Sequence, residues 1–307
     1  MRTFLVTGGA GFIGSHIAAA LVRRGDRVRV LDNLSTGNLA NLKEVGGQPE
    51  FFEADLLDTE ILREALQGVD CVFHQAALAS VPRSIKKPLD THAACATGTI
   101  NLLNESRKAE VRRVIYAASS SAYGDQINSA KRETDLPAPL SPYAAAKLAA
   151  EYYAQAFFHA YGLETVAIRY FNVFGPRQNP LGEAGVVSIF TGQMLKGVQP
   201  IIFGDGNKTR DYIYIEDIVQ ANLNVLEDIG NNQTFNLGSG KETSDFEIFS
   251  SVRDHVGVNI EPNFANIRKG EARRVCLNIE KANKILKWSP QRSLNKGVLE
   301  VVKSFKK

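Results

Sequence analysis

The stretch "TGGAGFIG" (residues 7–14) follows a short apolar segment, "TFLVTG" (3–8), and opens an amphipathic one, "FIGSHIAAALVRRG" (12–25). Its glycines fit two spacings, G-x-G-x-x-G at Gly9, Gly11 and Gly14, and G-x-x-G-x-x-G at Gly8, Gly11 and Gly14. A Cβ at such a turn would hold the backbone away from a pyrophosphate, whereas glycine lets the free N–H groups at the helix start bind the anion. The stretch therefore predicts a strand–turn–helix unit that binds a dinucleotide. The alternative is a tight turn with a purely structural role.

The pattern of the first half of the chain continues this unit. Apolar, strand-like runs occupy residues 3–8, 27–32, 50–55, 70–77, 111–119 and 164–172, and helix-like periodicity occupies 12–25, 59–68, 88–109 and 142–162. Strands that alternate with helices form parallel βαβ units, so we expect an α/β fold with a doubly wound parallel sheet. After about residue 175 the chain becomes richer in Gly, Pro and Asn. We therefore expect a dinucleotide-binding domain at 1–174 and a smaller α/β lobe at 175–307, with room for elements exchanged between them.

Composition excludes several classes of protein. The 307 residues include 36 basic and 33 acidic ones, and the net charge of +3 comes without a long basic block, so nucleic acid is not an expected partner. The three cysteines are far apart and lack metal-ligand spacing, which predicts no metal site, no disulfide framework and a reducing, cytoplasmic location. No window approaches 18 apolar residues and no signal peptide is evident, so we expect no membrane contact.

Two carboxylates indicate which dinucleotide binds. Asp32 ends the second strand, 18 residues after Gly14, where it can accept hydrogen bonds from both ribose hydroxyls and would repel a 2′-phosphate. The residues that follow it include no arginine, which favours NAD over NADP. Asp55 ends the third strand, where it could meet the adenine amino group. Its alternative role is a helix N-cap.

The stretch "SPYAAAK" (141–147) places Tyr143 and Lys147 four residues apart, on one face of a helix. A tyrosine that works as a base near pH 7 needs its pKa lowered by about three units, or about 4 kcal/mol. A neighbouring ammonium contributes to that shift by stabilising the phenolate, and the positive nicotinamide ring of NAD⁺ contributes more. The alternative is an ordinary pair on a solvated helix surface.

Seven motifs appear in order along nearly the whole chain: "TGGAGFIGSH", "LDNLSTG", "FHQAALASVPRS", "AASSSAYGD", "SPYAAAK", "RYFNVFGPRQ" and "GDGNKTRDYIYIEDI". Together they resemble the extended short-chain dehydrogenase/reductases, and within them the nucleotide-sugar 4-epimerases. The likeness is strongest to the UDP-N-acetylglucosamine 4-epimerase branch, through "HQAALASVPRS" and "AASSSAYGD". The resemblance implies a Rossmann-like domain that binds NAD and a lobe that binds a UDP-sugar.

By this resemblance Tyr143 is the catalytic base, Lys147 its partner, and Ser119, 24 residues before the tyrosine, the third member. Tyrosinate 143 would take the C4 hydroxyl proton while hydride leaves C4 for NAD⁺, and a 4-keto sugar would turn over and take the hydride back on its other face. The cofactor contacts implied are Gly8, Gly11, Phe12, Ile13, Gly14, Asp32, Asn33, Ser35, Thr36, Gly37, Asp55, Leu56, Gln75, Ala76, Ala77, Tyr143, Lys147 and Tyr170.

The resemblance also assigns the substrate contacts. Arg210 and Arg268 would clamp the diphosphate, the backbone of Phe203 would meet uracil, and Val275 would border the sugar, where a tyrosine would fill the space of an N-acetyl group. The full set is Ser80, Ser120, Ser121, Asn172, Val187, Phe203, Arg210, Tyr212, Arg268 and Val275. Valine favours UDP-N-acetylglucosamine and UDP-N-acetylgalactosamine, with UDP-glucose and UDP-galactose also accepted. TDP in place of UDP stays open.

Other members of the family perform different chemistry. Nucleotide-sugar 4,6-dehydratases typically carry Thr-Asp-Glu where this chain has three serines, 119–121, and without a carboxylate there we favour simple epimerisation. A UDP-glucuronate epimerase, a reductase that releases NAD(P)H and a silent NAD-binding scaffold remain alternatives. Cys95 departs from the usual asparagine, and His74 is expected to cap its strand. The apolar faces of helices 88–109 and 143–161 predict a homodimer joined by four helices.

Overall fold

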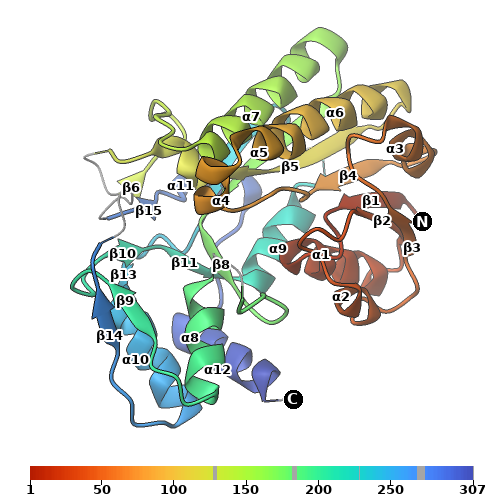
Figure 1. Ribbon diagram of the computed structural model, residues 1–307. Helices are drawn as coiled ribbons and strands as arrows, with labels where there is room; N and C mark the ends of the chain where they lie inside the picture. Colours follow the sequence, from red (N-terminus) through yellow and green to blue (C-terminus); the bar gives the residue numbers. More distant parts are fainter. Residues whose placement is uncertain (127–129, 182–184, 228, 268–273, 307) are drawn as a thin grey trace. The chain divides into compact units, whose positions relative to one another are not determined.

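Figure 1 shows the computed structural model of the protein, which describes residues 1–126, 130–181, 185–227, 229–267 and 274–306. The strands are β1 (Thr3–Thr7), β2 (Arg27–Asp32), β3 (Glu50–Glu53), β4 (Cys71–His74), β5 (Arg113–Ser119), β6 (Ala130–Lys131), β7 (Glu164–Tyr170), β8 (Asn172–Phe174), β9 (Ile201–Phe203), β10 (Thr209–Arg210), β11 (Tyr212–Tyr214), β12 (Gln233–Leu237), β13 (Thr243–Ser244), β14 (Asn263–Ala265) and β15 (Cys276–Leu277). The α-helices are α1 (Phe12–Arg23), α2 (Leu39–Lys43), α3 (Thr59–Leu66), α4 (Val81–Lys86), α5 (Pro88–His92), α6 (Gly98–Lys108), α7 (Pro142–Tyr161), α8 (Val186–Leu195), α9 (Ile215–Asn224), α10 (Asp245–Val256), α11 (Glu280–Leu286) and α12 (Leu294–Phe305).

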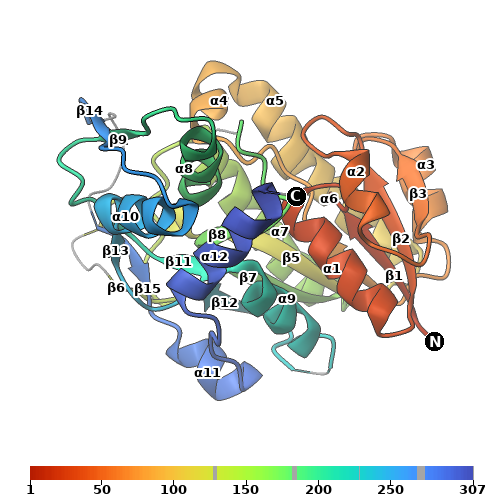
Figure 2. The ribbon, with the colours of Figure 1, turned by 90° about the horizontal axis from the view of Figure 1, so that it is seen from below.

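Seven strands form the main sheet, in the order β12-β7-β5-β4-β1-β2-β3. The pairs β1/β2, β1/β4, β2/β3 and β4/β5 are parallel. The strand order reverses direction between β1 and β4, and in such sheets ligands bind beyond the carboxyl ends of the strands at that point. Helices α5, α6 and α7 cover one face of the sheet and α1 covers the other (Figures 1 and 2). The predicted doubly wound α/β fold is confirmed.

The central strands owe their place to apolar side chains on both faces. Phe4, Leu5 and Val6 of β1 are fully buried, and every residue of β4 is buried. Parallel strands that are covered by helices on both sides have such continuous apolar runs, because neither face meets water. The apolar residues 4–6 therefore suit β1 to a central position in the sheet, where both of its faces are covered.

Two predicted elements differ from the structure in a way that matters for the site. The helix expected at 88–109 consists of α5, a π-helical segment at Ala93–Thr97 that contains Cys95, and α6. The strand expected at 164–172 ends at Tyr170, and β8 begins at Asn172, where it pairs with β11 instead of joining the main sheet. Such local interruptions are set by contacts distant in sequence, which an apolar pattern does not record.

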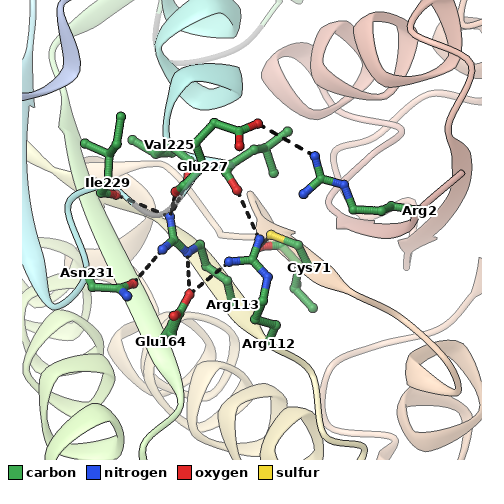
Figure 3. Close-up of polar contacts among 11 residues, drawn as sticks. Arg2, Cys71, Arg112, Arg113, Glu164, Val225, Glu227, Ile229 and Asn231 are labelled. Atoms are coloured by element: carbon green, nitrogen blue, oxygen red, sulfur yellow. Dashed lines mark hydrogen bonds and ion pairs between the residues drawn. The ribbon is translucent and has the colours of Figure 1, made fainter.

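A buried arginine ties the segment after α9 to the sheet. Arg113 on β5 is fully buried, and its Nε atom donates to Glu164 Oε2 on β7 over 2.8 Å. Figure 3 shows the further bonds of Arg113, to the carbonyl oxygens of Val225 (2.6 Å), Glu227 and Ile229 (3.2 Å) and to the side chain of Asn231 (2.8 Å). Arg112 adds bonds to Glu164 Oε2 and to the Leu226 carbonyl, at 3.1 and 3.0 Å. Together the two guanidinium groups hold Val225, Leu226, Glu227, Ile229 and Asn231 against β5 and β7.

The chain divides into two compact units that interleave along the sequence. One comprises residues 1–122, 139–169 and 219–235, and the other comprises 123–138, 170–218 and 236–307. In the second unit α8, α10 and α12 pack together, as Figure 2 shows, and the short pairs β8/β11 and β9/β14 are parallel. The functional division at residue 174 stays a prediction, since compactness does not assign a function to either unit.

The described residues hold no helix that is both long and apolar enough to cross a bilayer. In the same parts of the chain, no group of His, Cys, Asp and Glu side chains is arranged to hold a metal ion. Cys71, Cys95 and Cys276 are buried and have free thiols.

Candidate active site

The glycine turn between β1 and α1 has no room for side chains. Gly8 adopts φ +66°, and a Cβ there would lie 2.7 Å from the backbone nitrogen of Ala76. A Cβ on Gly14 would lie 2.2 Å from the carbonyl oxygen of Gly8. Gly11 is the N-cap of α1 and makes no side-chain capping bond. A bare turn at a helix start fits a pyrophosphate, which the first N–H groups of the helix would bind.

Asp32 is positioned to meet a ribose. It ends β2, and its two carboxylate oxygens accept hydrogen bonds from the backbone N–H groups of Ala10 (3.0 Å) and Leu34 (2.9 Å). Burial raises the pKa of Asp32, and these N–H groups oppose that shift. Each oxygen keeps a second acceptor site, so the carboxylate can still receive hydroxyl groups. A Cβ on Gly37 would lie 2.7 Å from Asp32 Oδ1, which leaves glycine as the residue that fits there.

Asn33 and Asp55, both expected at the cofactor, are hydrogen-bonded to each other. The Asn33 side-chain amide donates to Asp55 Oδ2 over 2.6 Å, and Asp55 Oδ1 accepts from the Leu57 backbone over 2.9 Å. The N-cap of α3 is Asp58, whose side chain accepts from two backbone N–H groups. The helix-capping alternative for Asp55 is therefore wrong.

The other expected cofactor residues flank the same edge of the sheet, with one exception. They follow β1, β2, β3 and β4 within the first unit, at Phe12, Ile13, Ser35, Thr36, Leu56, Gln75, Ala76 and Ala77. Tyr170, the last residue of β7, is buried and belongs to the second unit. Their contacts with NAD stay predictions.

The structure brings the three expected catalytic residues together. Ser119 ends β5, and its hydroxyl lies close enough to the phenol of Tyr143, near the start of α7, to act to lower the pKa of that phenol. The side chain of Ser141 caps α7 by accepting from the Ala144 N–H over 3.2 Å, which fixes where the helix begins. Lys147 lies one turn further on and is 3% exposed, so it is no solvated surface lysine.

The other two serines of the predicted triplet flank Ser119. Ser119 Oγ lies 2.8 Å from Ser121 Oγ and also accepts from the Ser121 backbone N–H over 3.2 Å. Ser120 is buried. The hydroxyl network around Tyr143 therefore contains serines where other members of the family are expected to carry carboxylates.

The expected depression of the Tyr143 pKa is not produced by the polypeptide. Burial, followed by the nearby Cys95, raises the pKa of Tyr143 to about 12, and the Ser119 hydroxyl only partly opposes this. Burial lowers the pKa of Lys147 to about 8, against the opposing effects of Cys95 and Glu151. The Lys147 ammonium lies 4.3 Å from the ring centre of Tyr116. The loss of hydration dominates because both groups are inside the protein.

Two further features near this site were not expected from the sequence. His74 is fully buried and hydrogen-bonded on both ring nitrogens, to Thr7 and to Thr99, each at 2.8 Å. Cys95 lies in the π-helical segment and packs with Ala146 against Tyr143. In the sequence, the cysteine at position 95 in place of the usual asparagine marked this segment as unusual. That substitution did not reveal the π-helical turn.

The second unit carries most of the expected substrate residues. Asn172 and Tyr212 are directly paired in the β8/β11 ladder, and Arg210 lies two residues before Tyr212. Arg210 Nη1 donates to the Thr209 carbonyl over 2.8 Å, and the buried Val275 donates its N–H to the same carbonyl over 3.4 Å. These four residues therefore share one neighbourhood of the second unit.

The remaining substrate residues are placed as follows. Phe203 ends β9, Val187 is buried in the first turn of α8, and Ser80 is the N-cap of α4 in the first unit. Arg268 lies outside the described residues. All ten substrate assignments stay predictions.

Asp211 holds the strands that carry Arg210, Tyr212 and Val275, a role that sequence reasoning missed. Its carboxylate is fully buried and accepts hydrogen bonds from four N–H and O–H donors, Ser239 N (2.6 Å), Ser239 Oγ (2.7 Å), Gly240 N (3.0 Å) and Leu277 N (3.2 Å), and a weaker one from the Cys276 thiol (3.6 Å). The bond to Leu277 fixes the strand that follows Val275. The donors come from residues far along the chain, so no local pattern announced them.

Comparison with known proteins shows what the chain is similar to. Residues 4–238 match the model of the NAD dependent epimerase/dehydratase family. A putative UDP-glucose 4-epimerase of Methanocaldococcus jannaschii is 41% identical over 304 residues, which cover 98% of either chain. A UDP-glucose 4-epimerase of Mycolicibacterium smegmatis is 41% identical over 313 residues, covering 100% of this chain and 99% of the relative.

Solved structures give the same result at the level of the fold. The UDP-glucose 4-epimerase of Thermotoga maritima with UDP-glucose superposes with a TM-score of 0.95 at 40% identity, covering 99% of each chain. A UDP-N-acetylglucosamine 4-epimerase of Methanobrevibacter ruminantium, in complex with UDP-N-acetylmuramic acid, gives 0.95 at 35% identity, covering 99% of this chain and 98% of the other. These identities do not single out the N-acetylglucosamine branch that the motifs suggested.

Proposed function

This chain belongs to the NAD dependent epimerase/dehydratase family, and from that premise we propose that it inverts C4 of a UDP-sugar with NAD as its cofactor. The observation that carries the proposal is the contact between Ser119 and Tyr143, one helical turn from the buried Lys147. The relatives named UDP-glucose 4-epimerase support the UDP-sugar as substrate class.

The residues divide the work between them. Bound NAD would supply the oxidant for C4 and a positive charge beside the phenol. As phenolate, Tyr143 takes the proton of the C4 hydroxyl, and later returns it to the C4 oxygen once the sugar presents its other face. Ser119, which lies beside Tyr143, orients that hydroxyl. The glycine turn at Gly11 and Gly14 and the carboxylate of Asp32 would hold the dinucleotide.

The serines around Ser119 favour epimerisation over the related eliminations. A dehydratase has to move a proton and a hydroxyl across C5 and C6, which needs an additional acid and base. Ser120 and Ser121 occupy the corresponding positions, and a hydroxyl is a poor base near neutral pH. In epimerisation the hydride would leave and return at C4, with NAD as its carrier, and the proton leaves and returns at the C4 oxygen, so no acid or base beyond Tyr143 is needed.

The test is to incubate the enzyme with a panel of UDP-sugars and to read the C4 configuration of the products by proton NMR. We expect inversion at C4 with no net NADH, and loss of turnover in Tyr143→Phe, which keeps the ring and removes the hydroxyl. NADH that accumulates in proportion to the sugar consumed would identify a dehydrogenase instead. Normal turnover by Tyr143→Phe would remove the proposed base.

We further propose that both acetylated and unacetylated sugars are substrates, because Val275 is small. The relatives that bind UDP-glucose and UDP-N-acetylmuramic acid support a sugar site of either kind. Val275→Tyr should suppress turnover of UDP-N-acetylglucosamine and spare UDP-galactose, while Val275→Ala should keep both. Equal loss of both substrates in Val275→Tyr would contradict the assignment of this pocket.

We propose a homodimer through α7 and the helical stretch 88–109 of the first unit, which comprises α5, the π-helical segment and α6, with α4 packed beside α5 and α7. Ile85, Leu89, Tyr152 and Tyr153 on these mutually packed helices have 64, 80, 50 and 44% of their surface exposed. A second copy would cover them in a four-helix arrangement. Light scattering should show a dimer that Leu89→Glu with Tyr152→Glu converts to a monomer. Phe264→Glu, an exposed site on β14, is the control. A monomeric wild type would overturn the proposal.

A further inference from the structure

A chain of buried hydrogen bonds runs beneath the catalytic residues and passes through His74. His74 is the last residue of β4 and has no exposed surface. Its Nδ1 atom lies 2.8 Å from Thr7 Oγ1, at the end of β1, and its Nε2 atom lies 2.8 Å from Thr99 Oγ1, at the start of α6. The imidazole therefore links the end of β1, which is paired with β4, to the start of α6.

The partners decide which nitrogen carries the proton. Thr99 donates its single hydroxyl hydrogen to the carbonyl oxygen of Cys95 over 2.7 Å, so toward His74 its oxygen can only accept. Nε2 must therefore carry a hydrogen. Burial, with a contribution from the Lys147 ammonium, holds the pKa of His74 well below its usual range, which keeps the ring neutral and leaves Nδ1 to accept from Thr7. The backbone N–H of Ala76 donates to Thr7 Oγ1 over 3.4 Å and completes this series of hydrogen bonds.

Both ends of this series of hydrogen bonds lie at the candidate active site. Ala76 lies against Gly8 of the glycine turn, where a Cβ would come within 2.7 Å of its nitrogen. Cys95 lies in the π-helical segment and packs against Tyr143. A π turn shifts the backbone bonding by one residue, and such turns occur often at functional sites. At this π turn the Thr99 hydroxyl donates a hydrogen bond to the Cys95 carbonyl oxygen. This bond holds the segment that packs against the phenol of Tyr143.

The groups that face the imidazole explain why it must stay neutral. Tyr116 on β5 lies with its ring centre 5.4 Å from that of His74, at an interplanar angle of 33°. On α7, the Lys147 ammonium lies 4.3 Å from the centre of the same Tyr116 ring, and the Tyr116 hydroxyl donates to the Lys147 carbonyl over 3.1 Å. The thiol of Cys95 is the remaining titratable group nearby. A charged His74 would thus oppose the Lys147 ammonium across one aromatic ring, without water to screen the two charges.

We propose that His74, as its neutral Nε2–H tautomer, is a positioning residue for the proposed epimerase. It links the loop after β4 to the π-helical turn and so fixes the surroundings of Tyr143, while adding no positive charge beside Lys147. The inference rests on the proposed function for its kinetic consequence, but its structural part, the tautomer and its two bonds, does not.

The first experiment reads the tautomer directly by ¹H–¹⁵N NMR of the imidazole in the wild-type protein between pH 6 and 9. We expect one protonated nitrogen, Nε2, that remains protonated alone over the whole range. A protonated Nδ1, or a doubly protonated ring at pH 7, would overturn the proposal whether or not the enzyme is an epimerase.

The second experiment compares variants kinetically. His74→Phe keeps the volume and removes both bonds, and we expect kcat to fall about tenfold or more with KM for the UDP-sugar nearly unchanged, because a small misplacement of reacting groups is costly in rate. His74→Gln, which offers an amide N–H toward Thr99, should recover part of that loss. Thr99→Val should reproduce the effect of His74→Phe and add little to it, since both break the same link. His159→Phe, exposed at the far end of α7, is the control.

Several outcomes would overturn the positioning role. One is a folded His74→Phe with wild-type kcat and only a lower melting temperature. If His74→Phe does not fold, Thr99→Val with unchanged kcat does the same. Should the wild type epimerise no UDP-sugar, the proposed function fails by itself. The NAD⁺ affinity of the same variants then decides the positioning role, and equal affinities in wild type, His74→Phe and Thr99→Val would overturn it.

Discussion

The affinity for NAD⁺ should rise steeply with pH, because cofactor binding has to overcome the high pKa of Tyr143. The polypeptide raises that pKa to about 12. A general base works best with a pKa near the operating pH. A shift from about 12 to about 7 spans about 5 pKa units, or about 7 kcal/mol of interaction that favours the phenolate. The cationic nicotinamide ring is the charge that NAD⁺ brings to this environment.

Because proton release from Tyr143 is linked to NAD⁺ binding, this interaction can be measured as the slope of NAD⁺ affinity against pH. If NAD⁺ lowers the pKa of Tyr143, then its binding above the lowered value of about 7 releases one proton, and affinity increases with pH until the free-enzyme pKa of about 12 is reached. Between pH 7 and 9 the dissociation constant should therefore fall about tenfold per pH unit, or about 100-fold in all. Lys147, with a pKa of about 8, loses charge over the same range and complicates the raw curve.

The assay is calorimetric titration of cofactor-stripped enzyme with NAD⁺ at several pH values from 6 to 9. Tyr143→Phe is the matched control, because it retains Lys147 and the aromatic ring and removes the titratable hydroxyl. The ratio of the wild-type to the variant affinity should climb with pH, and the same ratio for NADH, whose ring is neutral, should stay flat. An NAD⁺ ratio that is constant from pH 6 to 9 would refute the reasoning, since Tyr143 would then keep its proton in the complex.

Three more perturbations address other parts of the molecule. Gly14→Ala places a Cβ 2.2 Å from the Gly8 carbonyl oxygen, so the purified variant should carry less NAD, read from its absorbance ratio at 260 and 280 nm; full retention would contradict the turn geometry. Arg113→Met should lower the free energy of unfolding by about 3–5 kcal/mol in urea, because it leaves Glu164 and several carbonyls without their partner, whereas Lys303→Met, in an exposed pair with Glu300, should change it by less than about 1 kcal/mol. Asp211→Asn should weaken UDP binding while NAD⁺ affinity stays unchanged, since its hydrogen bonds support only the second unit; equal loss of both would indicate general unfolding.

The fold and the proximity of Tyr143 and Lys147 on one helix were predictable because their signals are local. The glycine spacing at 7–14, the capped start of α7 at Ser141 and the four-residue step from Tyr143 to Lys147 each depend on neighbours in sequence. An apolar run such as residues 4–6 similarly identifies a strand that is buried on both faces. The family resemblance, together with the strand predicted at 111–119, placed Ser119 at a strand end, where the structure has it.

The rest of the site depends on contacts that no local pattern encodes. The donors to Asp211 come from Ser239, Gly240 and Leu277, and the bridge through His74 joins residues 7 and 99. The π-helical turn around Cys95 was expected to be regular helix, because apolar periodicity does not distinguish a single shifted hydrogen bond. The rise in the Tyr143 pKa without cofactor was missed for a related reason, since burial is a property of the assembled fold and the pair spacing alone does not report it.

Burial dominates the pKa of four titratable groups of the first unit, Asp32, His74, Tyr143 and Lys147. Burial raises the pKa of Asp32 and Tyr143 and lowers the pKa of His74 and Lys147, so each group is driven toward its uncharged form. A site built this way disfavours a phenolate until a cation arrives beside it. The charge of the oxidised cofactor would then create the base in the same step that supplies the oxidant, so proton removal from a sugar hydroxyl could not run ahead of cofactor binding. A neutral His74 is consistent with that arrangement, because a fixed positive charge behind Lys147 would oppose the cation that the site has to admit.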